Sequence, residues 1–187
     1  MQNFLQSFNV LNNNEIDEFI QLSTKVKLNR SDYFIRAGDI CKEVAFVLSG
    51  TLRSFYISEK GDDFTYCITF PNNLVTAYSS FITGELTTEN IQAITAVELL
   101  VIPKKAIDNL VLKNVNWLKF LKVIAEQQYI ELEKRVFQLQ KDSAKIKYAQ
   151  LIKNQSKYIK EIPLQYLASY LGISQRHLSR IRKEVNF

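Results

Sequence analysis

The chain of 187 residues has only two cysteines and one histidine, and no apolar run that could cross a membrane. A membrane-spanning helix needs about 20 apolar residues. Cys41 and Cys67 are too few for a disulfide framework, and with His177 as the one histidine they do not suggest a structural zinc site. The N-terminal residues lack the basic and apolar segments of a signal peptide. We therefore expect a reduced, cytoplasmic protein without a membrane partner, metal or cofactor.

The same scarcity argues against catalysis. Enzymes built on a jelly roll, as cupins are, need clustered histidines and carboxylates as metal ligands. Here the one histidine lies near the C-terminus, outside the strand-rich part of the chain. No Ser–His–Asp or Cys–His arrangement can be assembled among the strands. The sequence therefore indicates a protein that is not an enzyme.

Basic residues gather towards the C-terminus. Residues 141–187 carry ten Lys or Arg against three Asp or Glu, whereas residues 1–140 carry 14 against 16. A nearly neutral body with a basic end is typical of a protein whose end meets a polyanion. A basic surface that only contacts solvent is the alternative.

The spacing of apolar residues predicts an α+β fold. Residues 12–28 begin with asparagines and have helical spacing, so we expect a short amphipathic helix there. Short runs rich in β-branched and aromatic residues then follow at spacings near ten residues, punctuated by glycines. Such runs favour an N-terminal antiparallel β-roll of the double-stranded, jelly-roll-like kind. The expected strands are 33–35, 44–49, 51–58, 64–70, 90–93 and 98–103.

Helical periodicity returns after residue 103, with a short helix expected over 104–112 and a long one over 114–140. The long helix would extend about 40 Å, more than one small barrel covers. An apolar stripe at alternating steps of three and four is typical of a helix that pairs with a partner. We therefore expect a homodimer, with packing inside the same chain as the alternative. The predicted interface residues are Leu118, Leu121, Ala125, Gln128, Leu132 and Leu139, with Arg135 also on the stripe.

The last residues have the pattern of a helix-turn-helix. Pro163 suits the start of a helix over 164–170, Gly172 suits the left-handed residue that ends it, and Ser174 suits the cap of a second helix over 175–185. The second helix of such a pair enters the major groove of DNA. Its apolar residues, expected to face inward, are Leu178, Ile181 and Val185. The predicted DNA contacts are Ser174, Gln175, Arg176, His177, Ser179, Arg180 and Lys183.

Geometry divides these contacts by role. Arg binds guanine bidentately and Gln binds adenine, so Arg176 and Arg180, on one helix face, are assigned to base edges. Each arginine could instead contact a phosphate or only solvent. Phosphate contacts are assigned to the lysines that precede the helix pair, Lys153, Lys157 and Lys160.

The order of barrel, long helix and terminal helix-turn-helix resembles the Crp/Fnr superfamily of bacterial transcription regulators. The residues that carry the resemblance are Ala37-Gly38-Asp39, Val47-Leu48-Ser49-Gly50-Thr51-Leu52-Arg53, Gly61-Asp62-Asp63, Ile162-Pro163, Leu167 to Ser174 and Leu178 to Arg182. It implies a cyclic-nucleotide-binding-like sensor barrel over 1–113, a dimerisation helix over 114–140 and a helix-turn-helix domain over 141–187. The implied partners are double-stranded DNA, a second copy of the chain and RNA polymerase.

The chain departs from the cAMP-binding members that it resembles. Those members hold the cyclic phosphate with a Gly-Glu-Leu turn and a later Arg, whereas the matching positions here fall near Thr76–Tyr78 and Thr87–Thr88. No Lys or Arg lies between Lys60 and Lys104 to pair with a buried phosphate. We therefore expect an effector other than cAMP, of unknown identity. The residues expected to line a pocket for a small neutral ligand are Thr76, Tyr78, Ser79, Ser80, Thr87 and Thr88.

The sequence ends at Phe187, directly after the second expected helix. The β-hairpin wing of the family is therefore expected to be missing, and the three lysines would take over its phosphate contacts. The leading hypothesis is a dimeric DNA-binding transcription regulator. The alternative is a module that senses a small molecule or protein and uses its terminal helices for assembly.

Overall fold

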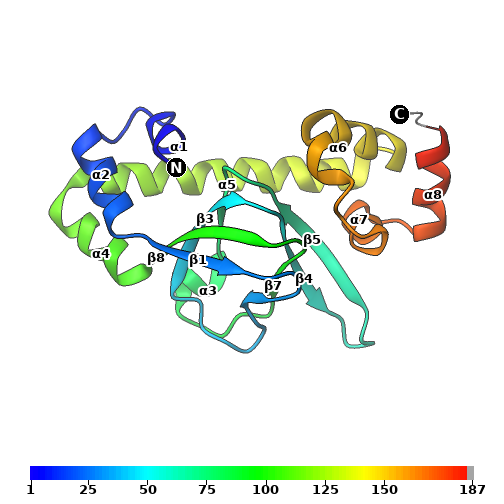
Figure 1. Cartoon of the computed structure of the whole chain (residues 1–187), viewed down its shortest axis with the longest axis horizontal. Helices are drawn as coiled ribbons and strands as arrows, with labels where there is room; N and C mark the ends of the chain where they lie inside the picture. The colour runs from blue at the N-terminus through cyan, green and yellow to red at the C-terminus, as the bar shows by residue number, and fades with distance from the viewer. Residues whose placement is uncertain (185–187) are drawn as a thin grey trace.

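Two antiparallel four-stranded sheets form the barrel, with strand orders β1-β8-β3-β6 and β2-β7-β4-β5 (Figure 1). The computed structural model describes residues 1–184, apart from the side chains of Lys157 and Tyr158. Buried residues from both sheets, such as Val47, Leu99 and Ile91, fill one core. The strands are β1 Thr24–Leu28, β2 Tyr33–Ile35, β3 Glu43–Ser49, β4 Leu52–Ile57, β5 Asp63–Thr69, β6 Leu74–Val75, β7 Asn90–Ala93 and β8 Val97–Pro103.

The six predicted strands are all present, with ends shifted by at most one residue. The helix predicted over 12–28 is wrong in its second half, because α2 spans Asn13–Gln21 and residues Thr24–Leu28 form β1, paired with β8. In β1 the half-buried Val26 and Leu28 alternate with exposed lysines, as in a strand with one buried face. The prediction also lacked the helix α1, Gln2–Gln6, the strand β6 and the helix α3, Tyr78–Thr83.

Short helices gather around the start of the long helix α5, Val115–Lys141. They are α1 Gln2–Gln6, α2 and α4 Lys104–Lys113. Asn12 and Glu15 form a reciprocal capping box at the start of α2, and the Glu15 carboxylate also accepts a hydrogen bond from the Asn116 side chain at 3.1 Å. Trp117 of α5 is buried and stacks on Phe19 of α2. The first third of α5 is thereby fixed to the N-terminal helices.

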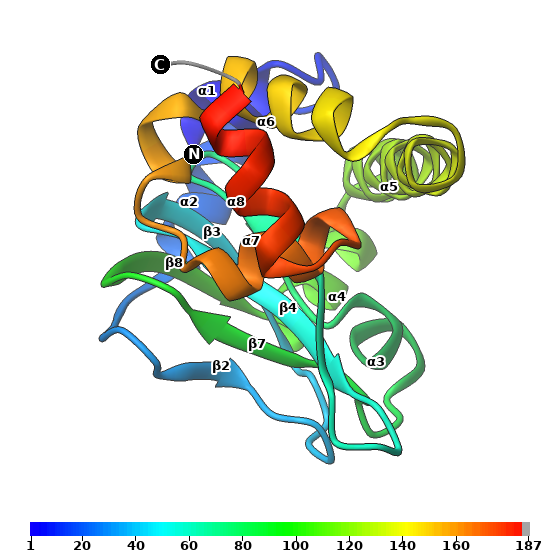
Figure 2. The ribbon, with the colours of Figure 1, turned by 90° about the vertical axis from the view of Figure 1, so that its right-hand side faces the viewer.

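Three helices follow α5, at the opposite end of the molecule from α2 and α4 (Figure 1). They are α6 Ala144–Ile159, which is interrupted at Gln155, α7 Leu164–Leu171 and α8 Gln175–Glu184. Ile68 and Phe70 of the barrel share one apolar cluster with Leu167 and Leu178 of α7 and α8. The end-on view of Figure 2 shows α7 lying against the barrel. The terminal helices therefore pack on the barrel through a common core.

Candidate nucleic-acid interface

The turn between α7 and α8 has the geometry that its residues favour. Gly172 ends α7 in the left-handed region, with φ +70°, where glycine is free of strain. The N–H of Ile173 donates to the carbonyl of Ala168 at 3.0 Å. The Ser174 hydroxyl then accepts a hydrogen bond from the N–H of His177 at 3.2 Å and caps α8. The turn thus joins two helices by local hydrogen bonds.

One face of α8 is buried and the other is open. Leu178 and Ile181 are buried against the apolar residues of α6 and α7, as predicted for the inner face. The third predicted inner residue, Val185, lies outside the described residues. Among the seven predicted DNA contacts, Ser179 is half-buried and six are exposed, namely Ser174, Gln175, Arg176, His177, Arg180 and Lys183.

The cations of the open face are free of acidic partners. Within residues 1–184, neither Arg176 nor Arg180 forms an ion pair. Arg182, by contrast, turns inward and donates from Nε to the Tyr148 hydroxyl at 3.1 Å. The charge of Arg176 and Arg180 is therefore available to an anion outside the protein.

The lysines of α6 differ in their surroundings. Lys145 pairs with Glu184 at 3.2 Å. Burial, and secondarily the nearby Arg135 guanidinium, lower the pKa of Lys147. Lys153 and Lys160 are exposed, whereas the side chain of Lys157 lies outside the described residues. Of the predicted phosphate contacts, Lys153 and Lys160 are thus well placed to meet solvent or an anion.

The predicted stripe on α5 is largely uncovered by the described part of the chain. Leu118, Leu132 and Leu139 are 56%, 64% and 46% exposed, and Gln128 is exposed as well. Leu121 and Ala125 are half-buried. Isolated leucines on a surface are ordinary, but a stripe of them along one helix indicates a surface that meets a partner.

Several of the residues predicted to form an effector pocket are engaged with backbone groups. The Thr76 hydroxyl donates to the Glu43 carbonyl at 2.8 Å, and the buried Ser80 hydroxyl accepts from the Cys41 N–H at 2.9 Å. Thr87 is also buried, and its hydroxyl accepts from the N–H of Glu89. Tyr78, Ser79 and Thr88 are exposed. Short hydroxyl side chains here satisfy nearby backbone groups instead of facing a ligand.

An open cavity of about 560 Å³ lies at one end of the barrel. None of the six residues predicted to contact an effector lines this cavity. Its walls come from the end of β2, the loop that follows it and the loop before β7, where Leu86 is 64% exposed. The lining residues are Phe34, Ile35, Gly38, Asp39, Ile40, Cys41, Lys42, Glu43 and Leu86.

Two negative findings concern residues 1–184. No helix in this range is long and apolar enough to span a membrane. No group of three or more His, Cys, Asp or Glu side chains within it could hold a metal ion.

Sequence reasoning missed a polar network around Arg53 of β4. Arg53 is 3% exposed and contacts residues of β5, β7 and α7. The only local signal was one charged residue in a strand of otherwise uncharged residues, since its partners in β5, β7 and α7 lie 10 to 113 residues further along the chain.

The chain is similar to known proteins in sequence and in fold. Residues 25–114 match the family model of the cyclic nucleotide-binding domain. No curated protein matches the sequence. FixK2 from Bradyrhizobium japonicum is a similar solved structure, with a TM-score of 0.77 and 13% identity over 87% of this chain and 84% of that one.

Two further solved structures are similar to this chain over most of its length. The c-di-GMP responsive global regulator CLP of Xanthomonas campestris has a TM-score of 0.70 and 15% identity over 93% of this chain and 91% of its own. A protein from Eubacterium rectale, assigned to the Crp/Fnr family of transcriptional regulators, has a TM-score of 0.71 and 17% identity over 97% and 87%. These last two proteins are thus described as regulators. Residues 25–114 therefore match the cyclic nucleotide-binding domain, and the chain shares an α+β fold with these solved structures.

Proposed function

We propose that the chain is a DNA-binding transcription regulator that acts as a homodimer. In this proposal residues 1–113 are the sensor barrel, 114–140 the dimerisation helix and 141–187 the helix-turn-helix domain. The observation that carries it is the open face of α8, where Arg176 and Arg180 are exposed and form no ion pair within residues 1–184, while the opposite face is buried. A helix with one free cationic face fits the major groove, where arginine reads guanine bidentately.

The remaining polar residues have supporting roles. Gln175 lies beside Arg176 and can read adenine, while Ser174, His177, Ser179 and Lys183 flank the arginines. Lys153 and Lys160 are exposed on the segment before α7 and would contact phosphates, together with Lys157. As a regulator the protein would also meet RNA polymerase.

Dimerisation through α5 explains the uncovered stripe. Pairing two copies would bury Leu118, Leu132 and Leu139, which the described part of one chain leaves exposed. A dimer also presents two copies of α8, and paired recognition helices bind half-sites about one helical turn of DNA apart.

The division between base and phosphate contacts predicts the effects of two substitutions. Replacing Arg180 by alanine should weaken binding to a site selected from random duplexes by about 1–3 kcal/mol, and binding to random DNA far less. Replacing Lys153 by alanine should weaken both alike and reduce the salt slope by roughly one unit. Fluorescence anisotropy on both duplexes at several salt concentrations measures these effects.

Arg30, which is exposed on the barrel, supplies the matched control. Arg30→Ala removes the same charge outside the three terminal helices and should leave both affinities unchanged. Equal losses on both duplexes for Arg180→Ala would make this arginine a phosphate contact. A wild-type dimer that binds no duplex would instead favour a sensor module whose terminal helices serve assembly.

The effector is expected to differ from cAMP. No Lys or Arg occurs in residues 61–103, and the residue that precedes α3 is Ala77, which supplies no side-chain cap. The loss of a charge-assisted phosphate contact costs about 1.5–3 kcal/mol, or roughly 10- to 150-fold in affinity. Calorimetry should therefore show cAMP binding no more tightly than adenosine, which lacks the phosphate. Micromolar affinity for cAMP that adenosine does not share would contradict this expectation.

A further inference from the structure

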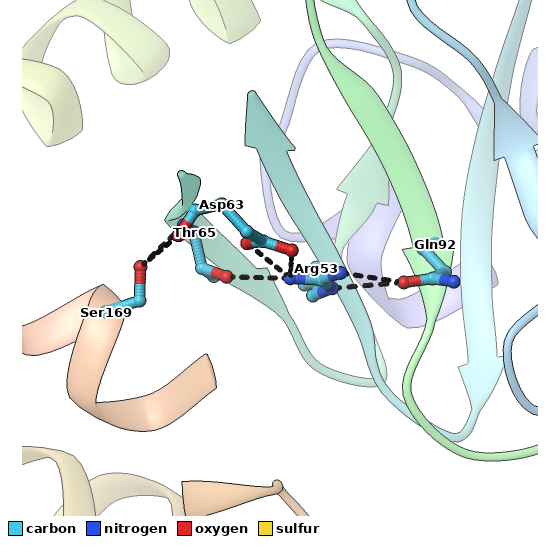
Figure 3. Close-up of polar contacts among 5 residues, drawn as sticks. All are labelled: Arg53, Asp63, Thr65, Gln92 and Ser169. Carbon is cyan, nitrogen blue, oxygen red and sulfur yellow. Dashed lines mark hydrogen bonds and ion pairs between the residues drawn. The ribbon is translucent and has the colours of Figure 1, made fainter. Parts of the chain in front are cut away.

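The barrel holds a buried arginine whose hydrogen bonds join three neighbouring strands. Arg53 of β4 donates from Nη1 to both carboxylate oxygens of Asp63, at 2.7 and 2.8 Å, and to the Thr65 hydroxyl at 3.2 Å. From Nε and Nη2 it donates to the Gln92 side-chain oxygen of β7, at 3.2 and 2.9 Å (Figure 3). Because β5 and β7 flank β4, the position of the guanidinium depends on all three strands.

The helix α7 completes the burial of the Arg53 guanidinium. The central guanidinium carbon of Arg53 lies 3.6 Å from the ring centroid of Tyr166 on α7 and 3.7 Å from that of Phe55 on β4. A planar cation between two aromatic faces is attracted by both, and the attraction grows when water is excluded. The Arg53 side chain is only 4% exposed, so water is largely excluded here.

A second contact lies one turn further along α7. The Ser169 hydroxyl accepts a hydrogen bond from the N–H of Thr65 at 2.8 Å and donates to the carbonyl of Asp63 at 3.3 Å (Figure 3). Both backbone groups belong to β5, the edge strand of its sheet. Ser169 thus occupies the position of a neighbouring strand.

The long helix holds α7 from another side. The Arg135 guanidinium of α5 lies 3.9 Å over the Tyr170 ring and donates to the Tyr170 carbonyl. α7 is therefore held by side chains of the barrel and of α5 together, while the cationic face of α8 stays exposed.

We infer that Arg53, Tyr166 and Ser169 form a latch by which the barrel fixes the orientation of α7, and hence of α8. The three are positioning residues and not DNA contacts. The inference rests on the proposed function, since the orientation of α8 matters only if α8 binds DNA. Gln92 extends the latch to β7, which begins four residues after the cavity residue Leu86. A displacement of β7 would therefore move Arg53 and the ring stacked on it.

The latch predicts how strictly the protein reads the spacing of two half-sites. A dimer with fixed recognition helices should reject a duplex whose half-sites are moved apart by two base pairs, whereas freed helices should tolerate it. Tyr166→Leu combined with Ser169→Ala should lower the affinity for the correctly spaced site by about tenfold and reduce the spacing preference by a similar factor. Binding to a single half-site should not change.

Hydrogen exchange provides a readout that needs no DNA. In the double variant, amide exchange should rise about tenfold in β5 and α7 but stay unchanged in β1 and β8, on the other sheet. Tyr166→Phe keeps the ring and should behave as wild type in both assays. Gln165→Ala, at an exposed position of the same helix, is the matched control.

The outcomes separate the latch from the function on which it rests. Wild-type protection of β5 and α7 in the double variant, an increase that spreads to β1 and β8, or failure of Tyr166→Phe would overturn the latch. If the double variant shows increased amide exchange but the same preference for half-site spacing as the wild type, the latch does not position α8. If the wild type binds no duplex, the proposed function fails, and hydrogen exchange still decides whether the latch exists.

Discussion

Replacing Gly50 by alanine is expected to lower the free energy of unfolding by about 3 kcal/mol or more, because strain and collision act together. Gly50 lies in the turn between β3 and β4 with φ +81°. A Cβ atom there would lie 2.2 Å from the Ala96 carbonyl oxygen and 2.9 Å from the Val97 Cα. Both neighbours are backbone atoms at the start of β8, so neither can move without disturbing the sheet. Urea unfolding followed by circular dichroism measures the loss.

Gly61 offers a control that separates the two causes. Its φ is +85°, close to that of Gly50, but a Cβ atom would have no neighbour within 4 Å. Gly61→Ala should therefore cost only the conformational strain, about 1–2 kcal/mol. Equal losses at the two positions would show that the collision with β8 contributes nothing.

Glutamate at Leu132 and Leu139 should convert the proposed dimer into monomers. Both side chains are exposed in the single chain, at 64% and 46%, so the substitutions should leave the fold of each copy intact. In the dimer they would place four carboxylates of like charge in the seam, where water is excluded and the nearby Arg135 is already engaged with Tyr170. Light scattering at micromolar concentration should show half the wild-type mass, with an unchanged circular dichroism spectrum.

The opposite face of α5 supplies the matched control. Ile130 is 46% exposed and lies about half a turn away from the stripe on a helix of 3.6 residues per turn. Ile130→Glu introduces the same charge and should leave the dimer intact. A wild-type monomer, a double variant that stays dimeric, or dissociation by Ile130→Glu alone would refute pairing through the stripe.

Regular elements could be predicted wherever one hydrophobic period persists for long enough. The strand β7 and the helix α5 have unambiguous periods and distinct ends, so the predicted limits differ by at most one residue. At residues 24–28 only Val26 and Leu28 carry the period of two, and the helical pattern of α2 before them extended the wrong assignment. β6 has two residues, too few for any period.

In the candidate site, too, the local contacts could be predicted from the sequence and the long-range contacts could not. Gly172 and Ser174 act on backbone groups within five residues of themselves, so the turn between α7 and α8 could be predicted from local chemistry. The bond between Thr65 and Ser169 joins residues 104 positions apart. No local pattern selects one tyrosine or serine for such a pairing, because it depends on how the terminal helices pack on the barrel.

The position of Ser169 also bears on the behaviour of the barrel towards other chains. An edge strand with free N–H and C=O groups is a template for pairing with a strand of another molecule. β5 has β4 on one side, and on the other Ser169 occupies the N–H of Thr65 and the carbonyl of Asp63. A barrel separated from its terminal helices would expose this template, next to the aromatic side chains of Tyr56 and Phe64, which are already 44% and 42% exposed. The terminal helices thus shield the barrel from self-association. Any movement of α7 away from β5 must expose an edge strand that can pair with another chain.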